Sequence, residues 1–152
     1  MYRFKKINNA DKYFLELIKK ISQYQEIVAL YLFGSFARGN ANENSDIDLA
    51  IIFDKNVPSE IYFEKKMDYL ILATEVLRTD EIDLIVLNNA PPSLAYRVFS
   101  EGKVLYENKE KKSQRIALQA RVFNLYFDFM PVRKTVSEGL KRRIREGYFG
   151  GR

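Results

Sequence analysis

The sequence of 152 residues contains no cysteine and no histidine. Without cysteine, neither a disulfide framework nor thiolate chemistry is available, which fits a reducing compartment. Without histidine, a Ser-His-Asp triad, a histidine general base and a histidine-ligated zinc site are all excluded. Any catalysis must therefore rest on Asp, Glu, Lys, Arg, Tyr or Ser side chains, and any metal must be held by oxygen ligands.

Long apolar segments are also lacking. No run approaches the roughly 20 residues that span a bilayer, and the start of the chain lacks the apolar region of a signal peptide. We therefore expect a cytoplasmic protein without a membrane partner. The net charge of +5 and the sequence pI of about 9.3 would suit a polyanionic partner. Solvated helix faces are the commoner reason for such a balance, so a nucleic acid is not required.

The length and the 47% hydrophobic content fit one globular domain of the α/β class. The predicted strands are apolar on both faces, so helices should cover at least one face of a small sheet and much of the other. We divide the chain into a core at 1–108 and a C-terminal helical arm at 109–152, packed on the same domain. In chain order we expect a helix capped by Asp11, strands at 27–34 and 46–53, and a helix from Pro58 to about Leu77. A strand at 81–88, a short helix ended by Gly102 and a short strand at 104–107 should follow. The arm should be a helix at 110–130, interrupted at Pro131 and resumed to about 146, and then a loose tail.

Two aspartates, Asp46 and Asp48, stand one residue apart at the start of an apolar run in "GSFARGNANENSDIDLAIIF". On a strand, residues two apart point to the same side and lie about 6.5 Å apart along the chain. Two carboxylates in that arrangement repel each other and resist ionising together. A bound Mg²⁺ would offset the repulsion, and two ions about 3.5–4 Å apart, as in phosphoryl transfer, would offset it better.

A third carboxylate is expected from the strand predicted at 81–88. Glu81 and Asp83 leave the same face of that strand, so either one can join the pair if the two strands are neighbours. We favour Asp83 because it lies closer to the apolar part of "EIDLIVL", where a buried carboxylate needs a partner.

Phosphate binding is expected just before the aspartates, at Gly34 and Ser35, where the predicted first strand ends. Glycine lets a backbone approach a ligand closely, and a helical turn starting at Ser35 would present N–H groups to phosphate. Arg38 is near enough in sequence to complete a phosphate clamp. Each feature alone is common in turns and on surfaces, so the combination carries the prediction.

This combination of Gly-Ser, about ten residues and Asp-x-Asp, with "EIDLIVL" later, resembles the polymerase-β-type nucleotidyltransferases. More narrowly, with "PPSLAYRVFSEGKVLYE" and "YFDFMPV", the chain resembles the minimal MNT group, the antitoxins that pair with HEPN toxins. The resemblance covers nearly the whole chain and implies a minimal nucleotidyltransferase fold. It also implies that Asp46, Asp48 and Asp83 bind metal and assist catalysis, and that Gly34 and Ser35 bind the nucleotide phosphates.

The reaction that the resemblance implies is AMP transfer from ATP to a tyrosine hydroxyl of a HEPN-family toxin, with Mg²⁺ as cofactor and release of pyrophosphate. In it, Arg38 would offset the charge of the leaving group and Asp83 would help to deprotonate the acceptor. The chain has no room for an acceptor-binding domain beyond its arm, which favours a protein acceptor. Two alternatives stay open: a nucleotidyltransferase acting on a small molecule or an RNA 3′ end, and a non-catalytic antitoxin acting by binding.

The arm has a second feature, since "RVFNLYFDFMPV" is apolar on nearly all sides of the predicted helix. One interpretation is packing into the domain on one side with partial exposure on the other. The alternative is an interface with a partner or with a second copy, where aromatic and Met residues are favoured. The basic runs at 109–112 and 141–145 leave a similar choice between RNA contact and solvated helix ends.

Overall fold

The structure is a computed structural model that describes residues 10–42 and 44–146. Helices and strands alternate along the chain, and short 3-10 turns join several of them. The elements are α1 (Ala10–Ile21), β1 (Ile27–Phe33), α2 (Gly34–Arg38), β2 (Ile47–Phe53), η2 (Ser59–Ile61), α3 (Tyr62–Leu77), β3 (Ile82–Val86), η3 (Leu87–Asn89), α4 (Pro92–Glu101), β4 (Lys103–Glu107), η4 (Lys109–Lys111) and α5 (Lys112–Arg145).

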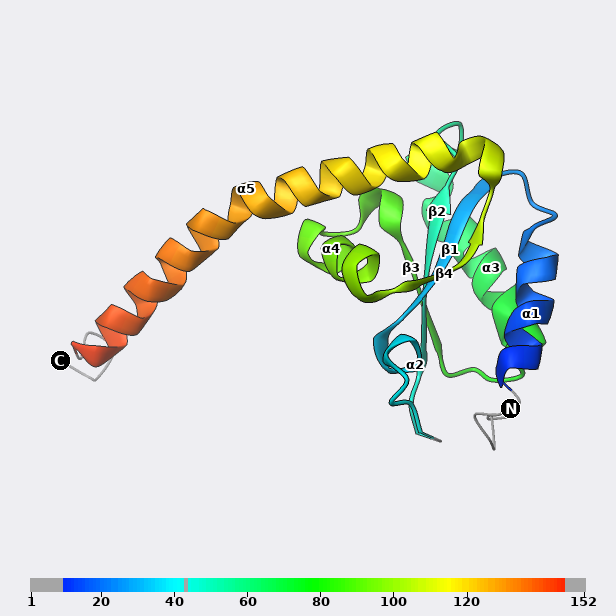
Figure 1. The fold of residues 1–152 in the computed structure, drawn as a ribbon, viewed down its shortest axis with the longest axis horizontal. Helices are drawn as coiled ribbons and strands as arrows, with labels where there is room; N and C mark the ends of the chain where they lie inside the picture. The colour runs from blue at the N-terminus through cyan, green and yellow to red at the C-terminus, as the bar shows by residue number, and fades with distance from the viewer. Residues whose placement is uncertain (1–9, 43, 147–152) are drawn as a thin grey trace.

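The four strands form one mixed sheet in the order β3-β2-β1-β4 (Figure 1). β1 lies antiparallel to both β2 and β4, whereas β2 and β3 run parallel. Parallel neighbours need a crossover, and α3 supplies it between β2 and β3. The expectation of a small mixed sheet with flanking helices is confirmed, and the predicted short strand at 104–107 is the edge strand β4.

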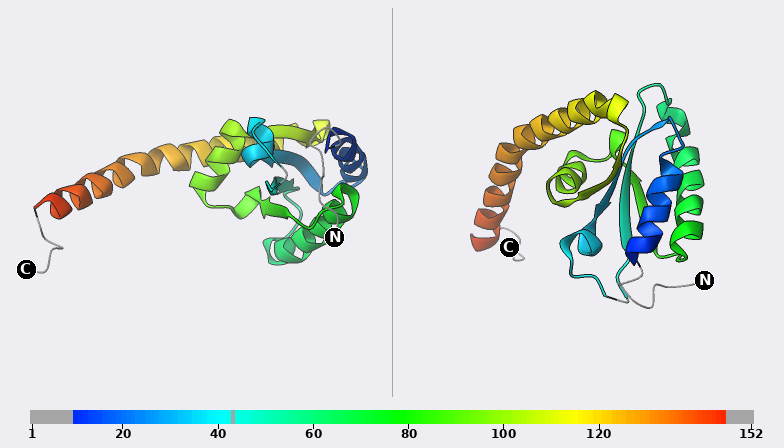
Figure 2. Two further views of the ribbon diagram at one scale, coloured as in Figure 1. Left: turned by 90° about the horizontal axis from the view of Figure 1, so that it is seen from below. Right: turned by 45° about the vertical axis from the view of Figure 1, so that its right-hand side comes forward.

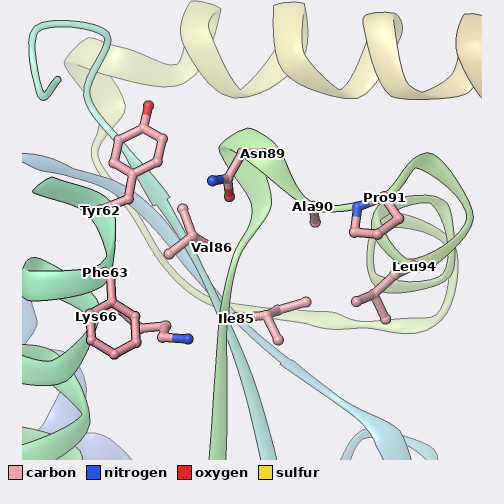
Figure 3. A pocket seen from close by; sticks show the side chains of 9 residues that line it. All are labelled: Tyr62, Phe63, Lys66, Ile85, Val86, Asn89, Ala90, Pro91 and Leu94. Carbon is pink, nitrogen blue, oxygen red and sulfur yellow. The ribbon is translucent and has the colours of Figure 1, made fainter. Parts of the chain in front are cut away.

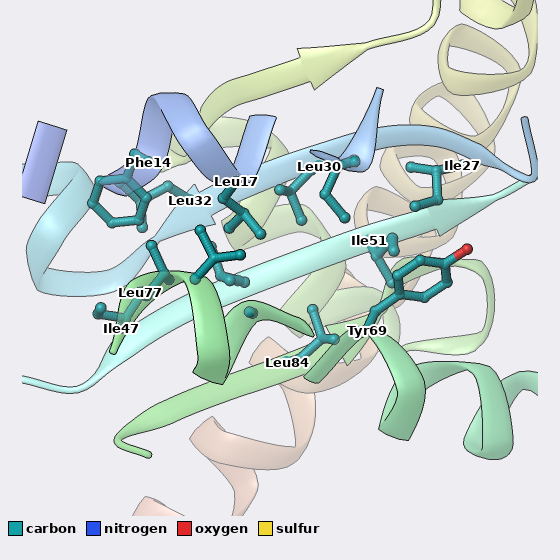
Figure 4. Close-up of a cluster of buried hydrophobic side chains, with 14 of the residues drawn as sticks. Phe14, Leu17, Ile27, Leu30, Leu32, Ile47, Ile51, Tyr69, Leu77 and Leu84 are labelled. Atoms are coloured by element: carbon teal, nitrogen blue, oxygen red, sulfur yellow. The ribbon is translucent and has the colours of Figure 1, made fainter. Parts of the chain in front are cut away.

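One face of the sheet is covered by α1 and α3. The odd-numbered residues of β2, such as Leu49, point to this side. Ile51 packs there with Leu17 of α1 and Tyr69 of α3 (Figure 4). The four-residue spacing of buried positions on α1, such as Leu17 and Ile21, follows from the 3.6-residue period of a helix.

The opposite face is covered by α4 and the first half of α5 (Figure 2). The even-numbered Ala50 and Ile52 of β2 pack there with Ala95 and Val98 of α4 and with Val122 of α5. Both faces of the central strands are therefore buried, which confirms the prediction from their unbroken apolar sequence. No helix in the described part of the chain is long and apolar enough to cross a membrane.

The predicted interruption at Pro131 is wrong, because α5 runs as one helix from Lys112 to Arg145. A proline inside a helix removes one N–H and frees the carbonyl four residues earlier, here that of Phe127. Phe127 is half exposed, so water can bond that carbonyl. The lost hydrogen bond is then tolerated in a helix that curves gently (Figure 1).

Two smaller boundaries also differ from the predictions. α1 begins at Ala10, so Asp11 lies within the helix rather than before it. β3 ends at Val86 instead of residue 88, because the chain turns into η3 at Leu87. The side chain of Asn88 in this turn accepts a hydrogen bond from the Phe53 N–H and donates one to the Phe53 carbonyl. The predicted loose tail at 147–152 lies outside the described residues.

A buried carboxylate joins the start of α5 to the end of β2. Asp54 accepts hydrogen bonds from the Asn56 N–H and from Gln114 of α5, and it pairs with Lys111 at 2.9 Å. Burial is the largest influence on the pKa of Asp54 and raises it, but the hydrogen bonds and Lys111 together outweigh burial and lower the pKa to about 2. The charged form of Asp54 therefore stabilises the junction between the core and α5.

We expect Asp54→Asn to lower the free energy of unfolding by about 2 kcal/mol at neutral pH, as the depressed pKa implies. A depressed pKa in the folded state gives stability that is complete above the unfolded pKa of about 3.9 and is lost as the pH falls through the folded value. The difference between wild type and variant, measured by urea unfolding, should therefore shrink between about pH 4 and pH 2. Asp128→Asn, at an exposed carboxylate of α5, is the control. A constant difference across this range would contradict the assignment.

Candidate active site

The parallel pairing of β2 with β3 places Asp48 directly beside Asp83. Register partners on neighbouring strands point to the same face, about 4.8 Å apart. That face is the one covered by α4, since Ala50 and Ile85, two residues further along each strand, pack there. Asp46 precedes Asp48 by two residues and acts on it electrostatically together with Asp83. Asp46 and Asp83 thus both lie within electrostatic range of Asp48, and of the two candidates on the third strand Asp83 is the register partner.

The loop before Asp46 is closed by its own polar residues. The Asn42 N–H donates to the Ser45 hydroxyl at 2.9 Å, and the Ser45 N–H donates to the Asn42 carbonyl at 3.1 Å. The Ile47 N–H then donates to the carbonyl of Glu81 at 2.9 Å, which starts the alignment of β2 with β3. Short polar side chains that bond to nearby backbone favour such turns.

The electrostatics at Asp48 are those of a crowded negative site. Partial burial raises the pKa of Asp48 most, and the nearby Asp83 and Asp46 raise it further. Arg38 of α2 and Arg97 of α4 act in the opposite direction and lower it. Burial and like charge together therefore outweigh the two arginines, and the site favours added positive charge.

The donor set suits a hard divalent cation such as Mg²⁺, which prefers carboxylate oxygens. Asp46 and Asp83 are exposed and Asp48 is half-buried, so a ligand can reach all three. Among the residues that the structure describes, no three His, Cys, Asp or Glu side chains converge closely enough to enclose a metal ion. The carboxylates are thus neighbours without forming a finished coordination shell, and a cation would have to draw them together.

Gly34 begins α2 directly after β1, with a backbone φ of +71° that side chains disfavour. A Cβ at this position would lie 2.0 Å from Oδ2 of Asp48, so any other residue would displace this carboxylate. Ser35 is half-buried in the next position, and Arg38 is exposed at the end of the five-residue helix. The structure therefore brings the glycine-serine turn and the aspartates to the same end of the sheet.

Arg97 was not predicted from the sequence. It lies in α4 between the buried Ala95 and Val98 and is itself exposed, within electrostatic reach of Asp48. A single arginine far along the chain carries no local signal, and only the packing of α4 over the carboxylate face brings it to the site. The positive charge near Asp48 thus comes from two helices, α2 and α4.

A groove of about 290 Å³ lies elsewhere, at the far end of β3 between α3 and α4 (Figure 3). Ile85 and Val86 form its floor, Tyr62 and Phe63 one wall and Leu94 part of the other. Asp46, Asp48 and Asp83 do not line it. The groove is mainly apolar and carries none of the predicted chemistry.

Comparison with known proteins identifies the class of this chain. The family described as polymerase beta, nucleotidyltransferase matches residues 16–111, and the chain belongs to this family. Within it, the chain falls in the minimal MNT group and is 30% identical over 137 residues to protein adenylyltransferase MntA of Aphanizomenon flos-aquae, covering 86% of this chain and 87% of that protein.

Several solved structures with the same fold come from toxin–antitoxin complexes. One, a toxin–antitoxin with AMP-PNP, superposes with a TM-score of 0.64 at 19% identity over 86% of this chain and 98% of the other. Another, a tri-AMPylated HEPN toxin of Shewanella oneidensis in complex with MNT antitoxin, gives a TM-score of 0.59 at 18% identity over 88% and 97%. At these identities the likeness shows the fold.

The close approach at Gly34 gives a direct test of the site. We expect Gly34→Ala to weaken binding of a nucleoside triphosphate with Mg²⁺ at least about 10-fold, because the new methyl group displaces the Asp48 carboxylate. Gly39→Ala is the matched control: its φ is +76°, but a Cβ there meets nothing within 4 Å. Both variants should lose about 1 kcal/mol of stability from backbone strain. Calorimetric titration that finds equal nucleotide affinity in the two variants would contradict this geometry.

Whether Arg97 contacts the β- and γ-phosphates of a bound nucleotide can be tested by comparing ATP with AMP. We expect Arg97→Gln to weaken ATP binding about 10-fold, the effect of one charge-assisted hydrogen bond, and to weaken AMP binding much less. Arg142→Gln, on the distant end of α5, should leave both affinities unchanged. Equal losses for ATP and AMP, measured by calorimetry in the same salt, would show that Arg97 does not bind the β- and γ-phosphates.

Proposed function

We propose that this protein is an antitoxin nucleotidyltransferase that transfers AMP from ATP to a tyrosine hydroxyl of a cognate HEPN toxin and thereby neutralises the toxin. The observation that carries the proposal is the set of three carboxylates just before β2, on β2 and on β3, with Asp48 against the glycine turn at the end of β1. Membership of the nucleotidyltransferase family supports the reaction class, and the similarity to MntA of Aphanizomenon flos-aquae, named a protein adenylyltransferase, supports a protein acceptor.

In this proposal Asp46, Asp48 and Asp83 hold Mg²⁺, with two ions the better match to three carboxylates. The bound cation would supply positive charge to the phosphates and ease ionisation of the acceptor hydroxyl. Gly34 lets the triphosphate approach the backbone, and the Ser35 hydroxyl orients the α-phosphate. Donation from Arg38 and Arg97 to the β- and γ-phosphates offsets the charge that builds up on the leaving group.

The transfer itself is an in-line displacement at the α-phosphorus. The phenol oxygen of the acceptor forms a bond to this phosphorus while the bond to the bridging oxygen breaks, and pyrophosphate leaves with the bonding electrons. Asp83, the exposed member of the register pair, accepts the phenol proton. The residues that bind the phosphates would hold the leaving oxygen, and the docked acceptor would place the phenol oxygen on the opposite side of the phosphorus.

We further propose that residues 1–108 form the catalytic core and residues 109–152 an arm that carries no catalytic group. The described sheet and the seven proposed site residues, Arg97 included, all lie in the first of these segments. We expect the reaction in the cytoplasm, where ATP is available. A small-molecule acceptor, an RNA 3′ end and neutralisation by binding alone are the alternatives that the experiment below separates.

The test uses Asp46→Asn with Asp48→Asn. We expect the double variant to fold, because removing like charges that crowd Asp48 relieves repulsion, and to lose AMP transfer by at least about 10³-fold, as expected when charges that stabilise a transition state are removed. Intact mass spectrometry of the proposed cognate HEPN toxin, after incubation with ATP and Mg²⁺, should show added AMP that maps to tyrosine. Glu60→Gln with Glu64→Gln, two exposed carboxylates near the start of α3, is the control.

Three outcomes separate the candidate functions. AMP on the toxin with the wild type and not with the double variant supports the proposal. Label from ATP on RNA or on a small molecule, with the toxin unmodified, supports the first alternative. Neutralisation of the toxin by the folded double variant as efficiently as by the wild type, without added mass, supports inhibition by binding alone.

A further inference from the structure

The second half of α5 carries an apolar ridge that no described part of its own domain covers. Val136, Leu140 and Ile144 are each four residues apart, so they align along one face of the helix, and between 49% and 65% of each is exposed. They continue the face that buries Val122 further up the helix, since Val136 follows Val122 by four turns. In Figure 1 this part of α5 extends beyond the domain.

A second uncovered ridge lies on α3. Phe63, Met67 and Ile71 show the same four-residue spacing, and between 38% and 69% of each side chain is exposed. At a rise of about 1.5 Å per residue, both ridges are about 12 Å long. Rows of side chains four residues apart are the ridges that pack into the grooves of another helix, so the two surfaces match in length and in spacing.

The charges beside the two ridges are opposite in sign. On α3, the exposed Glu64 and Asp68 directly follow the first two apolar residues of the ridge. On α5, the exposed Lys141 and Arg145 directly follow the last two. When two helices pack antiparallel, the residues that directly follow the ridge residues lie on the same side of the contact in both helices. This brings Glu64 near Arg145 and Asp68 near Lys141.

We propose that the free end of α5 packs antiparallel on α3 of a second copy of this chain, with Leu140 against Met67. A contact between two α5 helices is disfavoured, because it would bring Lys141 and Arg145 against the same cations. The end of α5 and α3 lie at opposite ends of the molecule in both Figure 1 and Figure 2, so copies associate head to tail. Such a contact generates a ring if it closes and a chain if it does not.

The contact between the two ridges is small. On the side of the contact opposite to the ion pairs, the cations Lys66 and Arg143 come near each other and repel. Stable interfaces use roughly 20–30 residues on each side, several times more than one ridge provides. We therefore expect dissociation constants of roughly 10–100 μM, equivalent to about −5.5 to −7 kcal/mol. The exposed ion pairs also make association weaker at high salt. The proposal does not depend on the proposed function, because neither ridge contains a site residue.

Sedimentation velocity of the isolated full chain tests the association. The mass should rise above the 17.9 kDa of one chain as the concentration increases to about 0.5 mM. Leu140→Asp and Met67→Asp should each hold the protein at 17.9 kDa. Leu15→Asp, at an exposed leucine of α1 outside both ridges, is the matched control and should associate like the wild type. A wild-type mass of 17.9 kDa over the whole range overturns the proposal.

Charge reversal tests the pairing of the two surfaces. Lys141→Glu with Arg145→Glu gives an acidic arm, and Glu64→Lys with Asp68→Lys gives a basic α3. Each variant alone should be monomeric, because its arm and its α3 carry charge of the same sign. An equimolar mixture should associate, because the arm of each variant is opposite in charge to the α3 of the other. Circular dichroism confirms that both are folded. A mixture that stays monomeric contradicts the pairing.

Crosslinking defines the partners and the orientation. The chain has no native cysteine, so Met67→Cys and Leu140→Cys in one chain form the only reactive pair. A short bismaleimide should join residue 67 of one copy to residue 140 of another. Phe63→Cys should crosslink with Ile144→Cys rather than with Val136→Cys if the helices are antiparallel. If the ridge variants abolish binding to a copurifying partner while the isolated wild type stays monomeric, the arm serves that partner and the proposal is wrong.

Discussion

Mutual repulsion among Asp46, Asp48 and Asp83 is the constraint on which the rest of the site depends. Carboxylates in water move apart, but these are attached to two hydrogen-bonded strands whose register fixes Asp48 beside Asp83. The strands are held in turn by buried neighbours on the other face, such as Leu49 and Leu84. The free energy of core packing therefore maintains a cluster of negative charge that the carboxylates alone would not form. In the proposed function, a bound cation would relieve this repulsion, and a polyphosphate would bind through the cation.

The groups that offset this charge come from separate elements. Gly34 holds the backbone against Asp48, Arg38 stands at the end of α2, and Arg97 reaches the same carboxylate from α4. Because α4 also buries Ala95 and Val98 in the sheet, its position is set by the core rather than by the site. The core thus sets the spacing between the backbones that carry the carboxylates and the arginines, and a bound cation would draw the exposed side chains together.

Features of the site that lie within one short stretch of sequence could be predicted, whereas those that depend on how distant segments pack could not. The turn at Gly34 and the pair Asp46 and Asp48 lie within one short stretch, so spacing and strand parity predicted where they lie. Asp83 required the further assumption that two strands are neighbours, which the parallel register confirms. Arg97 could not be found, since its place depends on how α4 packs. Pro131 was misjudged because a local rule for helix interruption ignores whether the freed carbonyl is exposed to water.

The length of α5 then bears on how an acceptor reaches the site. In the described part of the chain, the helix packs on β1 and α4 up to about Tyr126, and beyond that its surface contributes nothing to the core. Reaction at the α-phosphorus needs an acceptor oxygen held in line to within a fraction of an ångström, and flexible encounter does not supply this. In the proposed function, a protein acceptor that docks on the domain would supply that orientation. Because the free end of α5 is proposed to pack on a second copy, the acceptor would dock on the rest of the domain. That contact would decide which acceptors can be presented, while the carboxylates decide what is done to them.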